Sequence, residues 1–412
     1  MQKIKLLKTI TLAMCFLFLF FLIGQAFAAV ECGDNIDNDG DGKKDYSATA
    51  GAGDAQCASA TDGHESDNPL DWQDEPLFST HNTWYEKIPD NPSVMVGSAS
   101  FVAVLADGSR SPWGELDFAA ASSWGTPIYY VNKNQAVVNV TLDPAVTTQA
   151  ANYARAHGYN YVPIPTHAVP AGNIEYCAGT YRDAHMIIIS KEKRCSDVSG
   201  NYNTQATCEE AGGHWGRWEW DFFRIKNCSI LTSYDSSQWI TRAMTKYDLD
   251  GDGMNQPRDG NIAGTRAVLG AQMHGKVTWE EMNDAINNGI PVPHAIAFSF
   301  PGVSADTTTL YPMIYPSYTG WSTAYNKFGF YTPRLSMRIQ LDPSYNCDAN
   351  ITKPEENVIC HAFQTYGVIY VDNSGSSAVS LEDLYHNPYQ DGRNWASVGV
   401  SAAYDHSESF TQ

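Results

Sequence analysis

The sequence predicts an all-β fold, a β-sandwich or jelly roll with a few short helices, preceded by a small N-terminal module. Short β-rich segments recur along the chain and alternate with turns rich in Gly, Pro and Asn, as a sandwich requires. Charged residues make up only 17% of the chain and aromatic residues 12%, which is typical of strands that bury one face. With 412 residues, the chain is long enough to bury one large core.

The N-terminus has the layout of a secretory signal, predicted for residues 1–28. Lysines come first, an apolar block from Ile10 to Ile23 follows, and the small-residue site Ala26-Phe27-Ala28 comes last. Because the apolar block is too short for a convincing membrane span, we expect cleavage after Ala28. The mature chain is then expected to be exported, either secreted or held at the cell surface, with no membrane span.

The net charge indicates which partners to expect. Removing the three lysines of the signal lowers the formal net charge from −20 to −23. So acidic a chain is repelled by nucleic acids and by anionic membranes, which disfavours both as partners and favours cations.

The cysteines predict disulfides. Eight remain after cleavage: Cys32, Cys57, Cys177, Cys195, Cys208, Cys228, Cys347 and Cys360. An even number in an exported chain, with no pair at the close spacing of a zinc or redox motif, favours up to four bridges in an oxidising compartment. Local spacing favours pairing Cys32 with Cys57, Cys195 with Cys208, Cys347 with Cys360 and, by elimination, Cys177 with Cys228.

The chain is predicted to have two parts after the signal. Residues 29–66 are acidic and nearly free of large apolar side chains, so they are expected to form a separate module and linker. Residues 67–412 are expected to form the β-sandwich domain, with a disulfide-closed hairpin insertion near 195–215. Its predicted strands are 94–105, 128–131, 136–142, 186–190, 295–300, 335–341 and 368–371.

Helices are expected at 147–157, 278–289 and 357–366. In the second of these, Thr278 is the predicted N-cap, Glu281 closes a capping box, and Gly289 ends the helix. Gly367 is expected to end the third.

The stretch DNIDNDGDGKKD predicts a cation site in the N-terminal module. Its candidate ligands are Asp37, Asp39, Asp41, Lys43 through its carbonyl, and Asp45. These alternate positions, with Gly42 at the turn, match the first part of a calcium loop, and a cation would relieve the repulsion among the carboxylates. The twelfth position is Ala48, so Asp34 or Asp54 would have to supply the last ligand.

A second and complete calcium loop is predicted in DLDGDGMNQPRD. Its candidate ligands are Asp248, Asp250, Asp252, Met254 through its carbonyl, Gln256 and Asp259. The last ligand is Asp where Glu is usual. Two such loops in one acidic, exported chain make Ca²⁺ the expected cofactor. The alternative is a pair of solvated acidic turns, and a bound ion would more often brace a loop than do chemistry.

Polar side chains near the predicted strands are the candidates for an active site. They are His185, Asp183, His294, Tyr366, Arg266 and Arg338. Asp183 and His185 alternate, so an extended strand would direct both to one face of a sheet. The alternative for each histidine is a core residue that a carboxylate satisfies.

Two chemistries fit these residue types. In β-elimination of an acidic polysaccharide, His294 or His185 would be the base and Tyr366 the acid. The substrate carboxylate would then be neutralised by Arg266, by Arg338 or by calcium. Hydrolysis would need two facing carboxylates, for which Asp183 and Glu219 are the best available pair.

Several short motifs, in a fixed order, resemble a group of secreted bacterial β-sandwich or jelly-roll proteins of unassigned function. They are SPW at 111, GTPIYY at 125, VPIP at 162, DAHM at 183, HAIAF at 294, RLSMRIQL at 334 and YGVIYVD at 366. Where that group has Asn after SPW, this chain has Gly114. The opening CGDNIDNDGDGKKDY separately resembles an aspartate-rich calcium module of secreted and cell-surface bacterial proteins. Neither resemblance implies a reaction.

The stretch GHWGRWEW suggests a partly exposed aromatic patch for stacking on sugars, although alternation could direct Trp218 and Trp220 into the core. We therefore expect a protein that binds or cleaves extracellular polysaccharide or a cell-surface glycan. The alternative is a non-catalytic structural or adhesion protein braced by calcium and disulfides. The chain has no Gly-x-Ser-x-Gly elbow, His-Glu-x-x-His motif or phosphate loop, which disfavours esterases, zinc proteases and nucleotide enzymes.

Overall fold

A computed structural model describes a large part of the chain. The described residues are 77–78, 83–106, 116–119, 125–143, 160–166, 168–171, 183–200, 202, 204–227, 239–251, 265–266, 270–302, 304, 334–374, 377–384, 393–400 and 406–407. The chain divides into two compact units, 1–68 and 69–412, and every described residue belongs to the second. The predicted signal, the first calcium loop and the helix predicted at 147–157 lie outside the described residues.

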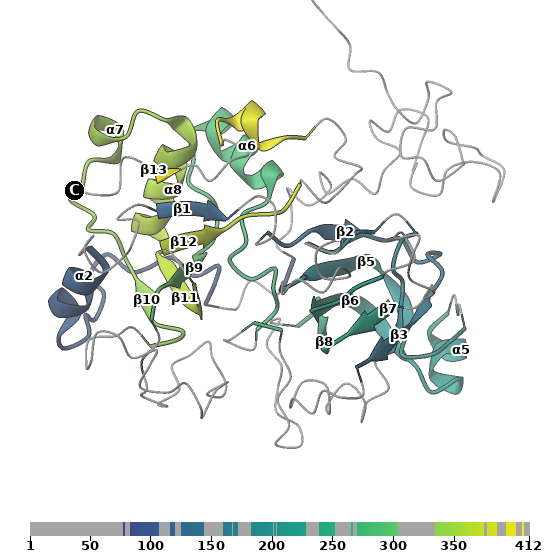
Figure 1. Ribbon diagram of the computed structural model, residues 1–412. Coiled ribbons are helices and arrows are strands. Elements are labelled where there is room, and N and C mark those ends of the chain that lie inside the picture. Colours follow the sequence, from purple (N-terminus) through teal and green to yellow (C-terminus); the bar gives the residue numbers. More distant parts are fainter. Residues whose placement is uncertain are drawn as a thin grey trace, which may run out of the picture. The chain divides into compact units, whose positions relative to one another are not determined.

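The first sheet has six strands in the order β10-β11-β9-β12-β1-β13 (Figure 1). Its strands are β1 (Leu116–Ala119), β9 (Ile296–Phe300), β10 (Arg338–Ile339), β11 (Val368–Asn373), β12 (Ser377–Ser380) and β13 (His406–Ser407). The pairs β11–β9 and β1–β12 are parallel, and the other three pairs are antiparallel. This sheet is therefore mixed.

Two smaller sheets are also mixed. The four-stranded sheet has the order β2-β5-β6-β8, and the three-stranded sheet has the order β4-β3-β7. Their strands are β2 (Ile128–Tyr130), β3 (Val138–Leu142), β4 (Tyr161–Val162), β5 (Met186–Ser196), β6 (His214–Phe223), β7 (Trp239–Thr241) and β8 (Ala243–Asp248). Three sheets with a few short helices confirm the predicted β-rich class. The sandwich arrangement remains a prediction.

The described helices are short. They are α2 (Ser98–Ala106), α5 (Gln205–Glu210), α6 (Trp279–Asn288), α7 (Cys347–Asn350), α8 (Pro354–Thr365) and the 3-10 helix η5 (Trp395–Val398). None of the helices in the described part of the chain is long and apolar enough to cross a membrane.

Local sequence signals place two of these helices. Helix α6 has the predicted capping box between Thr278 and Glu281, and Gly289 ends it at φ 62°. Helix α8 begins three residues before the predicted start, at Pro354, whose fixed φ suits the first turn. Gly367, at φ 74°, follows its last turn as predicted.

Two strand predictions were wrong or too long. The segment predicted as a strand at 94–105 instead contains helix α2, because a short apolar run carries no periodicity that separates a strand from a helix. The strand predicted at 335–341 is reduced to β10, because Ser336 adopts φ 64° and an extended strand cannot pass through a left-handed residue.

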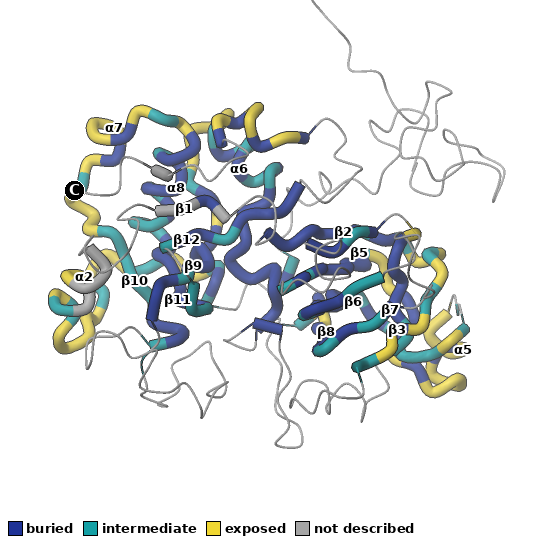
Figure 2. Tube along the Cα trace, in the orientation of Figure 1, coloured by how far each residue is buried: buried dark blue, intermediate teal, exposed yellow. Residues whose placement is uncertain are grey.

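The core lies on both faces of the four-stranded sheet as well as around the six-stranded one. Strands β5 and β6 are mostly buried, whereas α5 is mostly exposed (Figure 2). On one face of β6, Trp218 and Trp220 pack with Val140 of β3 and Trp239 of β7. The other face carries Ile187 and further apolar side chains of a second cluster. Burial of both tryptophans fits the core alternative for GHWGRWEW and leaves little of the aromatic patch exposed.

Two of the predicted disulfides are present. Cys195 is bonded to Cys208, which closes the connection between β5 and β6 around α5. Cys347 is bonded to Cys360 and ties α7 to α8. The other two predicted pairs, Cys32–Cys57 and Cys177–Cys228, lie outside the described residues.

Candidate functional site

Two carboxyl groups lie side by side on one face of β6. Alternation directs Glu219 and Asp221 away from the tryptophan cluster, and both side chains are fully buried, at 0% exposure. Each accepts a backbone N–H from the loop after residue 270. Glu219 Oε1 accepts from Met273 N at 3.1 Å, and Asp221 Oδ2 accepts from Gln272 N at 2.7 Å.

The two carboxyl groups also act on each other. Glu219 Oε2 and Asp221 Oδ1 are buried and have no hydrogen-bond donor among the described residues. A hydrogen bond between the two side chains raises the pKa of Glu219 and lowers that of Asp221, so we infer that Glu219 donates a shared proton to Asp221. Burial and the charge of Asp221 raise the pKa of Glu219 well above its usual range, and burial raises the pKa of Asp221 to about 6. Glu219 is therefore the protonated member of the pair at neutral pH.

Arg266 and Gln272 connect this carboxyl pair to its surroundings. The buried Arg266 donates from Nη1 to the carbonyl of His274 at 2.8 Å and to that of Ala271 at 3.3 Å. The guanidinium lowers the pKa of Asp221, and Asp221 in turn favours the charged form of Arg266. Gln272 Nε2 donates to Thr265 Oγ1 at 2.9 Å. Polar contacts of Arg266 and Gln272 thus fix the loop after residue 270 in place against β6.

His185 lies at the half-buried edge of this cluster. Its Nδ1 is 3.1 Å from the Phe222 carbonyl and 2.7 Å from Gln272 Nε2. The carbonyl can only accept, so it selects the tautomer with the proton on Nδ1 and leaves Nε2 basic. Gln272 Nε2 requires the opposite tautomer, and exchanging the amide nitrogen and oxygen of Gln272 reconciles the two contacts. In that orientation the Gln272 oxygen accepts from His185 Nδ1 and from the Thr265 hydroxyl, in place of the donation to Thr265.

The pKa of His185 is lowered to about 4, chiefly by burial and also by the positive charges of Lys276 and Arg266, while the hydrogen bond to the Phe222 carbonyl opposes the shift. His185 is therefore neutral at pH 7 and lies near the charged Arg266 and near Lys276, which is protonated in only part of the molecules at that pH. A neutral imidazole in that setting can accept a proton from an anionic molecule that the positive charge attracts.

Asp183 does not share a strand face with His185, which corrects the prediction. Strand β5 begins at Met186, and Ala184 adopts φ 45°, so the chain is not extended between the two residues. The Asp183 carbonyl accepts from Arg224 N at 2.8 Å, and burial raises the pKa of the Asp183 carboxyl. The partner of Glu219 is Asp221, which the hydrolysis hypothesis did not choose.

His294 lies in a different set of contacts. Its Nδ1 donates to the Ala295 carbonyl at 2.9 Å, and its Nε2 is 3.3 Å from Glu281 Oε1. Burial lowers the pKa of His294, but the charge of Glu281 and the hydrogen bonds outweigh burial, so the pKa is raised overall. Glu281 thus pairs with this histidine and also caps α6.

Tyr366 and Arg338 form a third set. Arg338 Nε donates to the Tyr366 carbonyl at 2.8 Å, and Arg338 Nη2 donates to the Glu86 carbonyl. Burial raises the pKa of the Tyr366 hydroxyl. The candidate residues thus fall into separate sets. His185 and Arg266 belong to the carboxyl cluster, whereas Arg338 contacts Tyr366. Within the described part of the chain, no hydrogen bond, ion pair or ring contact joins these two sets to each other or to His294.

The second predicted calcium loop is described only at its start. Asp248 Oδ1 accepts from Asp250 N at 2.9 Å. Asp250 Oδ1 accepts from Arg217 Nε and Nη2, both at 2.8 Å, and Asp250 Oδ2 lies 3.9 Å from Lys193 Nζ. The remaining ligands, Asp252, Met254, Gln256 and Asp259, lie outside the described residues, as do all those of the first loop.

The oxygen donors of this start fit a hard cation such as Ca²⁺, although Arg217 and Lys193 already neutralise Asp250. No group of three or more His, Cys, Asp or Glu side chains that could hold a metal occurs among the residues the structure describes.

Sequence reasoning missed the loop that covers β6. Gln272 and Met273 donate to the carboxyl pair and Lys276 contacts Ser380, yet all three lie in AQMHGKV, which matches no motif. The visible signal was the pair of acids at alternate positions in an otherwise aromatic strand, WEWDFF. Two acids on a buried face require partners, which could have indicated a polar loop against β6.

No protein-family model matches this chain, and no curated protein or solved structure matches it either.

Proposed function

We propose that this protein is an exported, calcium-binding protein that acts on extracellular acidic polysaccharide and cleaves it by β-elimination, with His185 as the base. The observation that carries this proposal is the neutral, half-buried His185 beside Arg266 and Lys276. The positive charge of Arg266, and of Lys276 while it is protonated, attracts a substrate carboxylate and stabilises the negative charge that develops when the neighbouring proton leaves. His185 Nε2 accepts that proton, because the Phe222 carbonyl orients the ring through Nδ1.

The sequence suggested Tyr366 as the acid, but Tyr366 lies with Arg338 in a separate set of contacts. Glu219 is protonated at neutral pH, but it is fully buried and so does not reach a leaving oxygen. The proposal therefore assigns the base and the neutralising charge to this cluster, and no acid.

His185→Gln is expected to lower the rate of cleavage of uronate polymers by about 100-fold or more, because the amide cannot accept the proton. The variant keeps an N–H for the Phe222 carbonyl, so stability should be preserved. Unsaturated product is measured by its ultraviolet absorption with polygalacturonate and alginate as substrates. His361→Ala, at a half-exposed histidine of α8 that bonds Asp348, serves as the control and should retain full activity. Equal activity of His185→Gln and the wild type would rule out His185 as the base.

The second candidate function is a non-catalytic, cell-surface structural or adhesion protein. Burial of Glu219, Asp221 and Arg266 favours it, because fully buried groups can serve packing alone. This alternative predicts binding to polysaccharide or cells with no ultraviolet signal and no new reducing ends. Wild-type protein that gives neither signal across a panel of acidic polysaccharides would establish it against the lyase proposal.

Calcium is proposed to bind the loop that begins at Asp248, with carboxylate oxygens as ligands. Because Asp250 is already paired with Arg217, calcium must compete with that guanidinium for Asp250 Oδ1. Arg217→Gln is therefore expected to tighten calcium binding by up to about 5-fold, since a half-exposed ion pair is worth up to about 1 kcal/mol. Calcium titration calorimetry on chelator-treated protein measures this, with Arg242→Gln as the control. Absence of calcium uptake by wild type and variant alike would refute the proposed site.

A further inference from the structure

Lys276 and Ser380 are fixed beside each other by backbone pairing. Val277 pairs with Leu381 in a parallel bridge. Val277 N donates to the Ser380 carbonyl at 2.9 Å, and Glu382 N donates to the Val277 carbonyl at 2.9 Å. The residue before Val277 and the residue before Leu381 are therefore held in register, and their side chains meet.

The contact between the two side chains is direct. Lys276 Nζ lies 2.9 Å from Ser380 Oγ and 3.4 Å from the Leu381 carbonyl. Lys276 is buried, whereas Ser380 is half-buried at the end of β12. Ser380 is thus the more exposed residue of the pair and Lys276 the enclosed one. This arrangement suits a serine that attacks a substrate and a lysine that acts as its base.

The surroundings favour the neutral amine. The pKa of Lys276 is lowered to about 7, chiefly by burial and also by the charge of Arg266. Three acids oppose this effect: Asp383, Glu382 and Asp221. Near neutral pH the amine is therefore unprotonated in a substantial fraction of molecules, and a neutral amine can accept the hydroxyl proton.

We propose that Ser380 and Lys276 form a nucleophile and base pair that transfers acyl groups from esters. The Ser380 Oγ–H proton passes to Lys276 Nζ while Oγ forms a bond to the carbonyl carbon of the ester. The bond from that carbon to the leaving alkoxide oxygen breaks, and the alkoxide takes the proton from Nζ. Water, deprotonated by the same amine, then cleaves the acyl-enzyme and restores the serine.

This activity goes beyond the proposed β-elimination and does not depend on it, because it does not use the His185 base. Lys276 is common to both proposals, in its charged form there and in its neutral form here. The substrate class is an ester carbonyl, such as the acetyl esters that decorate sugar hydroxyls. The pair also differs from the Gly-x-Ser-x-Gly elbow, whose absence from the chain therefore does not exclude it.

The test uses the full-length exported protein and a fluorophosphonate probe, with the site of modification mapped by peptide mass spectrometry. The probe is expected to label Ser380, and the labelling rate is expected to rise with pH through about 7, the pKa of Lys276. Ser380→Ala should remove the label. Ser377→Ala, at another half-buried serine of the same strand, should label as the wild type does.

Substitution of the lysine separates a base from a structural hydrogen bond. Lys276→Arg keeps a positive donor but cannot accept the proton, so its labelling rate should fall by about 100-fold or more. Circular dichroism and thermal melting report whether that variant is folded, and Lys276→Met provides a second variant without a charge. Release of p-nitrophenol from p-nitrophenyl acetate should follow the same order. Folded wild-type protein that leaves Ser380 unlabelled at pH 8, or a Lys276→Arg variant that labels at the wild-type rate, would overturn the proposal.

Discussion

Replacing Lys246 by Met is expected to lower the free energy of unfolding by about 3–5 kcal/mol, the cost of leaving one member of a buried ion pair alone. Lys246 on β8 is ion-paired with Asp197, and both side chains are only 5% exposed. Lys246 Nζ also donates to Ser196 Oγ at 2.7 Å and lies 3.9 Å from the ring centre of Trp218. Methionine fills the space but leaves the Asp197 carboxylate without its cation.

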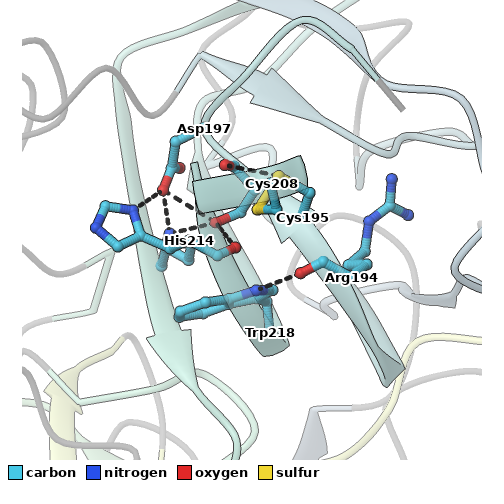
Figure 3. Close-up of polar contacts among 8 residues, drawn as sticks. Arg194, Cys195, Asp197, Cys208, His214 and Trp218 are labelled. Atoms are coloured by element: carbon cyan, nitrogen blue, oxygen red, sulfur yellow. Dashed lines mark hydrogen bonds and ion pairs between the residues drawn. A yellow bond between two sulfur atoms is a disulfide. The ribbon is translucent and has the colours of Figure 1, made fainter. Parts of the chain in front are cut away.

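Asp197 has few means to relax. It lies beside the Cys195–Cys208 disulfide and points toward His214, whose Nδ1 is 3.0 Å from Asp197 Oδ2 (Figure 3). Its backbone is held at φ 70°, and Asp197 Oδ1 has no hydrogen-bond partner among the described residues. The loss of Lys246 therefore leaves Asp197 with hydrogen bonds from Ser196 and His214 but without its buried cation, which costs most of the pair's stabilisation.

Urea unfolding monitored by tryptophan fluorescence measures the effect. Lys133→Met is the matched control, because Lys133 pairs with Glu192 at 3.3 Å while their side chains are 49% and 47% exposed. This control is expected to cost less than about 1 kcal/mol. The double variant Lys246→Met with Asp197→Asn should recover part of the loss, since it removes the unpaired charge. A Lys246→Met effect no larger than that of Lys133→Met would contradict the buried pair.

Replacing Glu219 by Gln is expected to stabilise the protein at pH 8 by about 1–3 kcal/mol and to change stability little at pH 4. The pKa values of Glu219 and Asp221 are raised in the folded protein by burial. As the pH rises above about 4, the unfolded chain loses these protons first, so the folded state binds more protons and its stability falls. For Asp221 this loss is complete above its folded pKa of about 6, and for Glu219 it continues at higher pH.

Glutamine supplies the missing hydrogen permanently. Its Nε2 can donate to Asp221 in place of the shared proton, while its Oε1 still accepts from Met273 N. Chemical unfolding at pH 4, 6 and 8 measures the free energy of unfolding of wild type and variant. The difference between the two proteins isolates the effect of this pair, because the other titrating groups are the same in both. Glu210→Gln, at an exposed residue of α5, is the control and should show no pH-dependent difference. A Glu219→Gln variant that is less stable than wild type at pH 8 would disprove the shared proton.

Features built from neighbouring residues were predictable. The capping box of α6 and the pairings Cys195–Cys208 and Cys347–Cys360 each involve positions that are close along the chain. Such contacts form at a low entropic cost, because only a short loop has to close. The β-rich class followed in the same way from turn residues and short apolar runs, although α2 shows that a short run can equally form a helix.

The candidate site depends on contacts that are distant along the chain. The sequence by itself determined that Glu219 and Asp221 share one face of β6, because side chains of a strand alternate. Only the tertiary structure decided that Gln272 and Met273, 51 and 54 residues away, donate to them, and that His185 stands with Arg266 while His294 pairs with Glu281. The physical reason is that a buried charge accepts whichever partner packing brings to it, and no local pattern in the chain encodes that partner.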